Sequence, residues 1–224
     1  FATGYKGGGI NPRPFFAVQI ATFGEEEVET TELGLKATLA DGRVRLNTAI
    51  FQNDQKGIQL NQAACEIPGA GGVITIGPPC AKPANVGDAE TEGVEIELDV
   101  AATERLGIDM SASSIDFKYT RLDPTVASAL FVPGGRGQMD YSMKTPYTPE
   151  LTWSAGIQYA FPLSGGGAIT ARVDATYQDE VYTQAVNYLQ SQPVNYRKTA
   201  WIDEYTLAHL RLSWRSGNSG WETA

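Results

Sequence analysis

The chain has 224 residues, of which 42% are hydrophobic, and its formal net charge at pH 7 is −9. This length suffices for one sizeable domain, and an acidic chain without a clustered Lys/Arg face is a poor partner for nucleic acid, which needs basic patches. No apolar run approaches the roughly 20 residues that a transmembrane helix needs. This does not exclude a membrane β-barrel, because its strands are short and only half apolar.

Stretches with a period of two run through the whole chain and predict β-strands that have one apolar face. The clearest is residues 151–161, where Trp153 and Ile157 share the apolar phase and Thr152 and Gln158 the polar phase. In chain order, the predicted strands cover residues 1–6, 29–40, 43–55, 88–101, 108–119, 151–161, 169–178 and a last stretch that ends at Trp214. A short strand is also predicted within residues 15–22, and another strand begins near residue 221.

The connections between these strands alternate between long and short. Long connections are predicted at residues 7–27, 56–87, 121–147 and 183–199, and short turns at residues 41–42, 103–107, 162–167 and 216–220. The Asp41-Gly42 turn is the strongest hairpin signal. Short turns at one end and long loops at the other are typical of outer-membrane barrels. The sequence therefore predicts an all-β fold, an antiparallel transmembrane β-barrel with an apolar outer face toward lipid.

One predicted strand changes its apolar phase. Ile108 is an even-numbered apolar residue, whereas Ile115, Phe117 and Tyr119 are odd-numbered. Two explanations remain open. A β-bulge near Ser113-Ser114 would shift the phase, and so would a strand that extends beyond the membrane.

Opposite charges occupy the inner phase of neighbouring strands. Arg43 and Arg45 are expected to face Glu97 and Asp99 near the periplasmic end, and each such pair contributes about 0.2–1 kcal/mol. No nucleophile or histidine lies near these carboxylates or Glu95 in the sequence. We interpret them as a solvated lumen wall rather than a catalytic pair.

The sequence offers no convincing catalytic, cofactor or metal site. His209, the single histidine, lies inside a strand without a Ser or Cys placed beside it, so it is interpreted as a lumen-wall residue. The glycine runs 7–9 and 165–167 do not stand between a strand and a helix and are interpreted as turns.

Two cysteines, Cys65 and Cys80, lie in one Gly- and Pro-rich connection. A disulfide that closes this loop is the favoured interpretation if the protein passes through an oxidising compartment. A structural zinc site is disfavoured because it would need four ligands, and two free thiols are the remaining alternative.

Several segments resemble the β-barrel of TonB-dependent outer-membrane receptors, in the order found in that family. The segments with this resemblance are Gly4 to Pro12, Glu32-Leu33-Gly34-Leu35-Lys36, Asp41 to Asn47 with Ala49-Ile50-Phe51 and Gln59, Gly87 to Glu95, and Pro149 ahead of the strand that contains Trp153. Each motif alone is weak, but their order and spacing cover nearly the whole chain.

The resemblance implies that residues 1–224 are the C-terminal part of a 22-stranded barrel, with about nine or ten strands present. Both ends of the chain look like strand segments, so we expect a fragment that lacks the N-terminal plug domain, the segment that contacts TonB and the last barrel strands. It also implies a location in the outer membrane of a Gram-negative bacterium, where lipid surrounds the barrel.

The implied function is active uptake of a scarce nutrient such as a ferric siderophore, vitamin B12 or an oligosaccharide, with energy supplied through TonB and no bond made or broken. Aromatic and Arg side chains of the long loops suit ligand contact. The candidates are Arg136, Tyr141, Tyr188, Tyr196 and Arg197. A passive porin and a soluble β-rich binding or adhesion domain are the alternatives.

Overall fold

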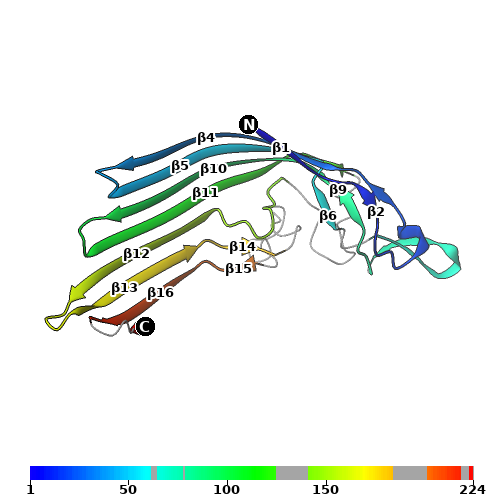
Figure 1. Cartoon of the computed structure of the whole chain (residues 1–224). Helices are drawn as coiled ribbons and strands as arrows, with labels where there is room; N and C mark the ends of the chain where they lie inside the picture. The colour runs from blue at the N-terminus through cyan, green and yellow to red at the C-terminus, as the bar shows by residue number, and fades with distance from the viewer. Residues whose placement is uncertain (62–64, 78, 125–140, 184–200, 218–221, 224) are drawn as a thin grey trace.

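The computed structural model of the chain describes residues 1–61, 65–77, 79–124, 141–183, 201–217 and 222–223. Its main feature is one nine-stranded sheet with the strand order β1-β4-β5-β10-β11-β12-β13-β16-β17 (Figure 1). The strands are β1 (Ala2–Lys6), β4 (Glu26–Leu39), β5 (Val44–Lys56), β10 (Gly87–Ala101), β11 (Leu106–Leu122), β12 (Leu151–Pro162), β13 (Gly167–Gln178), β16 (Tyr205–Ser216) and β17 (Glu222–Thr223). All neighbouring strands are antiparallel. The predicted all-β, up-and-down architecture is confirmed.

The longer connections contain short elements at one end of the large sheet (Figure 1). Four two-stranded sheets pair β2 (Gly9–Ile10) with β3 (Thr22–Phe23), β6 (Gln59–Asn61) with β9 (Pro83–Asn85), β7 (Cys65–Pro68) with β8 (Ile74–Gly77), and β14 (Val181–Tyr182) with β15 (Trp201–Ile202). Two 3₁₀ turns, η1 (Ala17–Gln19) and η2 (Ala70–Gly72), complete them. The predicted strand at 15–22 is wrong, because η1 occupies the middle of that segment.

The short connections lie at the opposite end of the sheet. In the β4–β5 hairpin, Asp41 and Gly42 both have positive φ (54° and 85°), and the Arg43 N–H donates to the Ala40 carbonyl at 3.1 Å. Asp-Gly suits such a turn because both residues tolerate the left-handed region. The predicted hairpin is confirmed.

Apart from one shift at the long-loop end of β10 and β11, the register between the long strands is continuous, so residues of one phase form rows across the sheet. One row joins directly paired residues of six strands: Val44, Val100, Ile108, Ile157, Val173 and Leu210. The adjacent row on the other face contains Arg45, Asp99, Asp109, Gly156, Asp174 and His209. One face of the sheet is therefore apolar and the other is polar.

Of the two explanations for the phase change in β11, the β-bulge near Ser113-Ser114 is wrong. The β10–β11 register is unbroken through those residues and shifts only where Asp88 pairs with Arg121 and Ala89 pairs with Tyr119. Ile115, Phe117 and Tyr119 therefore stay on the inner face. They are apolar because this end of the strand meets folded loops instead of an open lumen.

A small core lies between the inner face of β11 and the loops. It contains Ile58, Val86, Ala89, Phe117, Tyr119 and Met143, with Leu60 and Leu122 packed against it. The Phe117 and Tyr119 rings meet edge to face at a centroid distance of 4.9 Å. Among the described residues, no helix has the length and hydropathy needed to cross a membrane.

Candidate functional site

The outer face of the sheet carries a broad band of exposed apolar side chains, which we call the apolar belt. Its members with more than a third of their surface exposed are Leu33, Leu35, Leu39, Ile50, Val94, Ile96, Met110, Leu151, Ile157, Tyr159, Phe161, Ile169, Val173, Leu210, Leu212 and Trp214. Exposed apolar surface of this extent marks a face that contacts something other than water. Its place on every long strand suits hydrocarbon.

Aromatic residues lie toward both ends of the apolar belt on β12 and β13. Trp153 pairs with Tyr177 across β12 and β13, and their rings stack at a centroid distance of 6.0 Å. Tyr159 and Phe161 lie at the short-turn end of β12 with their rings 4.7 Å apart. Such rings suit the two membrane–water interfaces.

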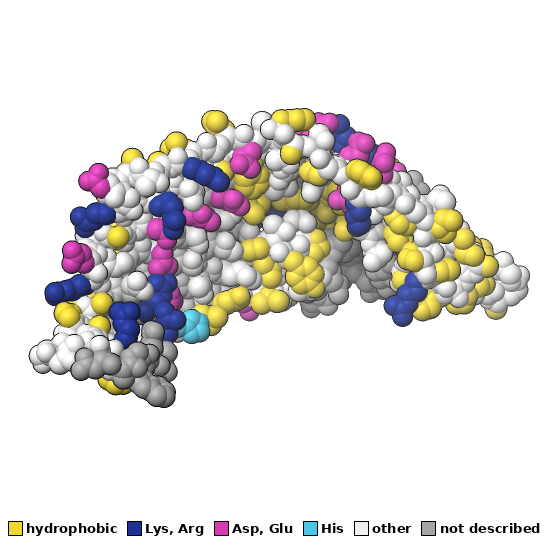
Figure 2. Space-filling view, in the orientation of Figure 1, with side chains coloured by type: hydrophobic (Ala, Val, Ile, Leu, Met, Phe, Trp, Pro, Cys, Tyr) yellow, Lys and Arg dark blue, Asp and Glu magenta, His cyan; other side chains and the backbone are white. Residues whose placement is uncertain are grey.

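The inner face carries paired charges and hydrogen-bonding groups, which we call the inner wall. Figure 2 shows Lys/Arg and Asp/Glu side chains gathered over the strands of this face. Arg45 forms the expected ion pair with Asp99 at 3.0 Å. Glu97 instead accepts a hydrogen bond from Asn47 at 3.1 Å, and Arg43 donates to the carbonyls of Ala101 and Ala102. The expected pairing of Arg43 with a carboxylate of β10 is wrong, because its guanidinium binds the backbone carbonyls at the end of that strand instead.

The tightest group of the inner wall is centred on Arg172 of β13. Its guanidinium makes two hydrogen bonds to Asp109 of β11, at 2.7 and 2.9 Å, and one to Asp174 at 2.8 Å. To reach Asp109, Arg172 passes over Gly156 of β12, where a Cβ atom would lie 2.3 Å from Nη2 of Arg172. The absence of a side chain at Gly156 therefore leaves room for Arg172 to cross β12 and link β13 to β11.

We expect Gly156→Ala to displace Arg172 from Asp109. Because the pair is partly exposed, the loss is about 1 kcal/mol in the free energy of unfolding. Urea unfolding of the detergent-solubilised protein would measure it. Gly34→Ala is the matched control, because a Cβ there lies no closer than 3.6 Å to any neighbour. Equal losses in both variants would contradict this role for Gly156.

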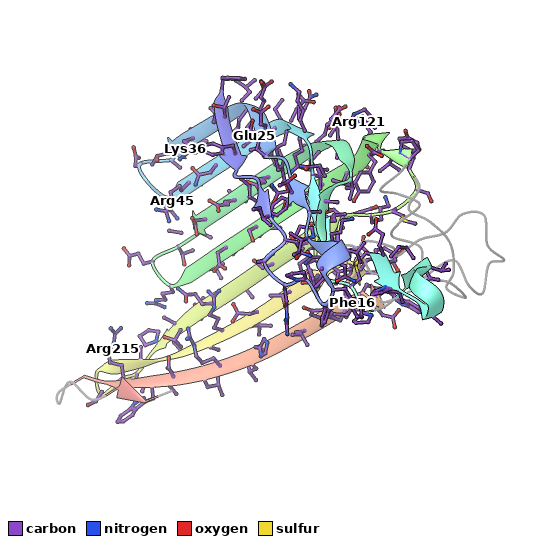
Figure 3. The ribbon with its side chains drawn as sticks, turned by 90° about the vertical axis from the view of Figure 1, so that its right-hand side faces the viewer. Phe16, Glu25, Lys36, Arg45, Arg121 and Arg215 are labelled. Atoms are coloured by element: carbon purple, nitrogen blue, oxygen red, sulfur yellow. A yellow bond between two sulfur atoms is a disulfide. The ribbon has the colours of Figure 1, made fainter. Side chains whose placement is uncertain are left out.

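The described residues within 7–25 and 57–86 fold together into one unit at the long-loop end, which we call the loop assembly. In Figure 3, Phe16 lies in this assembly, whereas Arg45 and Arg215 project from strands nearer the short-turn end. Fully buried Gln19 donates to the carbonyls of Glu66 and Pro79 at 3.1 and 2.9 Å. These bonds join the first long connection to the second.

Two further amides join the parts of the loop assembly, and one of them also reaches β1. The Asn85 side chain donates to the carbonyls of Gly24, Glu25 and Gly57 and accepts from the Gly24 N–H at 2.6 Å. The Gln59 amide donates to the carbonyls of Lys6, Gly7 and Gly24 at 2.9–3.3 Å. Carbonyls far apart in the sequence are thus joined through side-chain amides.

Cys65 and Cys80 are joined by a disulfide in the loop assembly, with their Cα atoms 5.5 Å apart. Beside it, Lys82 contacts Glu66 at 3.1 Å. A hydrogen bond from its own backbone, together with the Lys82 ammonium, holds the pKa of the Glu66 carboxyl below its ordinary value against partial burial. This pair therefore stabilises the loop at neutral pH, and its contribution is lost as the pH falls through the lowered pKa.

We expect the two cysteines to resist alkylation until a reductant is added. Loss of the bond by Cys65→Ala and Cys80→Ala together would free a 15-residue loop, at a cost of about 3 kcal/mol in local stability. Mass spectrometry after alkylation, and protease cleavage of the loop on whole cells, would measure the two effects. Alkylation of both thiols without reduction would contradict the pairing.

The ligand candidates from the sequence fall largely outside the described residues. Tyr141 is described and lies in a turn within the long β11–β12 connection, with 59% of its surface exposed. Arg136, Tyr188, Tyr196 and Arg197 lie outside the described residues. Sequence reasoning missed Gln19, Asn85 and Gln59, since no local pattern marks a polar residue that satisfies remote carbonyls.

The described residues hold no group of three or more His, Cys, Asp or Glu side chains that could bind a metal ion. The inner wall pairs its carboxylates with Arg and Asn side chains, or directs them to solvent. The sheet therefore has an apolar outer face and a polar inner face, and at one end it carries a loop assembly held together by side-chain hydrogen bonds and a disulfide.

Comparison with known proteins agrees with this arrangement. The family model for the β-barrel of TonB dependent receptor-like proteins matches residues 1–223. Similar solved structures include the ferric yersiniabactin uptake receptor FyuA from Yersinia pestis, at 19% identity and a TM-score of 0.65, which covers 95% of this chain and 26% of that one. The siderophore receptor PiuA from Acinetobacter baumannii matches at 18% identity and a TM-score of 0.59, covering 88% of this chain and 23% of that one.

The ferric preacinetobactin receptor BauA, also from Acinetobacter baumannii, matches at 14% identity and a TM-score of 0.58, with 96% of this chain and 26% of that chain covered. At these identities the likeness shows the fold alone. This chain spans about a quarter of the length of the solved structures that it matches. The family match over residues 1–223 goes further: the chain belongs to the TonB-dependent receptor family and forms part of its β-barrel.

Proposed function

We propose that this chain is part of the wall of an outer-membrane receptor that takes up a scarce nutrient in a Gram-negative bacterium, with energy supplied through TonB. The family match over residues 1–223 carries this proposal. The apolar belt supports it because a barrel needs a hydrocarbon-facing exterior. A soluble binding domain would instead pack this face against a second layer.

Ferric siderophores are the proposed cargo class. The support is that similar solved structures are described as receptors for ferric yersiniabactin, siderophores and ferric preacinetobactin. Vitamin B12 and oligosaccharides are the competing classes. The cargo would be bound and passed inward without a change in its covalent bonds, so the receptor is not an enzyme.

The proposed ligand contacts belong to the long connections. Tyr141 is exposed there, next to the core that anchors Met143. With Arg136, Tyr188, Tyr196 and Arg197, it would offer aromatic and guanidinium groups to an anionic chelate. The loop assembly would hold neighbouring loops in place before cargo binds, which lowers the ordering cost of binding.

Uptake measurements on whole cells test this proposal. A strain that lacks the complete receptor gene and a complemented strain would be given labelled ferric siderophores, cobalamin or oligosaccharides. We expect uptake of one ferric chelate that needs both the receptor and TonB. Receptor-dependent uptake that continues without TonB would contradict the proposal and support a passive porin.

A further inference from the structure

The first long connection is folded inside out over residues 10–20. Its two buried residues are polar, since Asn11 is 4% exposed and Gln19 is fully buried. The apolar side chains with more than a third of their surface exposed are Ile10, Phe15, Val18 and Ile20. This is the reverse of the arrangement that the hydrophobic effect favours in a free loop.

The buried amides hold this conformation. Asn11 donates to the Gln19 carbonyl at 2.9 Å and accepts the Arg13 N–H at 3.0 Å. Gln19 accepts the Phe15 N–H at 3.0 Å, and its two bonds to carbonyls of the second connection fix η1 at the base of the β7–β8 hairpin. The polar groups are therefore used within the loop assembly, and the apolar groups remain open to another molecule.

The β7–β8 hairpin adds Val73 and Ile74, which are exposed, and no charged residue occurs between residues 67 and 79. We call the exposed apolar residues of 10–20 and of this hairpin the loop surface, and Figure 2 shows hydrophobic side chains gathered over this end of the molecule. Arg13 is the single charged residue of 10–20. Within the described part of the chain, no hydrogen bond or ion pair engages its guanidinium.

The loop assembly leans over the inner side of the sheet, because Ile58 and Val86 pack with Phe117 and Tyr119 of the inner face. In a closed barrel the loop surface therefore lies beside the entrance to the interior. Membrane lipid does not suit it as an occupant, since the apolar belt is on the opposite face. A second copy of the chain does not suit it either, because two chains of net charge −9 repel each other.

The remaining occupant is the cargo, and the loop surface suits an anion that carries aromatic rings. A guanidinium pairs with anionic oxygens and stacks on aromatic faces, and exposed aliphatic side chains can bury the rings. We propose that the loop surface binds ferric chelates of aromatic ligands, such as catecholates and phenolates, in preference to aliphatic hydroxycarboxylate chelates. This inference rests on the proposed function and adds the chemical class of the cargo.

Retention of radiolabelled iron by the complete receptor, purified in detergent, tests the proposal. The probes are the ferric complexes of dihydroxybenzoylglycine, which is aromatic, and of citrate, which is aliphatic; both complexes are anionic. We expect the wild-type receptor to bind the aromatic complex about tenfold more tightly, because ring burial and the guanidinium contact each contribute a few-fold. Equal binding of the two complexes, tighter binding of ferric citrate, or binding of neither would overturn the proposal.

The double variant Arg13→Gln/Ile20→Ser is expected to assemble normally and to lose this preference, because both side chains are exposed. Arg105→Gln/Ile202→Ser is the matched control, since it removes a guanidinium and an exposed isoleucine outside the loop surface and should keep the preference. A preference that is unchanged in the loop-surface variant would overturn the proposal. TonB-dependent uptake of an aliphatic ferric chelate would also overturn it but leave the proposed function standing.

Discussion

Replacement of Ile157 or Val173 by Arg is expected to abolish assembly of the complete receptor in the outer membrane. The two residues are paired directly across β12 and β13, near the middle of the apolar belt. An arginine at a lipid-facing position near the bilayer midplane costs about 2–4 kcal/mol. Because Val173 also pairs with Leu210, neither arginine has a polar neighbour in its row. The amount of heat-modifiable receptor in purified outer membranes would measure the effect.

Thr170→Arg is the matched control for this prediction. Thr170 lies on the same strand as Val173 but on the inner wall, paired with Ala160 and Ser213. An arginine there meets the polar interior and should leave assembly close to that of the wild type. Normal assembly of both belt variants would show that this face does not contact lipid.

The second large effect is expected from Gly87→Ala, where the loop assembly joins β10. Gly87 has φ of +153°, and a Cβ atom would lie 1.9 Å from the carbonyl oxygen of Arg121. The Gly87 carbonyl accepts the Ile58 N–H at 2.8 Å, and the next residue, Asp88, binds both Arg121 and the Gly57 N–H. An alanine must separate β10 from β11 and so open the small core.

Backbone strain of this kind costs about 1–3 kcal/mol, and loss of core packing adds to it. We therefore expect a receptor that still assembles, because the apolar belt is unchanged, but whose residues 57–86 are readily cleaved by protease added to whole cells. Cargo binding should fall with it. Gly71→Ala separates strain from collision, since Gly71 also has positive φ (+72°) but no neighbour within 4 Å. Protease resistance equal in both variants would contradict the account.

The strands could be predicted from the sequence because the alternation of apolar and polar residues is a local pattern. In β12, the polarity of a residue indicates which face of the sheet it occupies. The Asp41-Gly42 turn could be predicted for the same reason, because the two turn residues are adjacent in the sequence. The loop assembly could not be predicted, because its stability depends on amides such as Asn85 that bond to carbonyls about 60 residues away. The residues next to Asn85 in the sequence do not indicate which carbonyls its side chain will bind.

The phase change in β11 shows why an inner face cannot always be recognised by polarity. Phe117 and Tyr119 are inner-wall residues in register, but they are apolar because loops pack on them. A rule that assigns apolar residues to lipid therefore fails where the strand leaves the membrane. The Arg172–Asp109 pair could not be predicted either. The requirement for glycine at position 156 becomes apparent only when β11, β12 and β13 are aligned, because Arg172 crosses β12 at that residue.

Lipid access along β12 of the complete receptor tests the central claim most directly. Single cysteines at positions 152–160 would carry a fluorophore, and lipids with a spin label on the acyl chain would quench it. We predict strong quenching at positions 153, 155, 157 and 159 and weak quenching at 152, 154, 156, 158 and 160, because the odd residues form the apolar belt. Quenching that does not alternate, or that is stronger at the even positions, would contradict a barrel wall with this outer face.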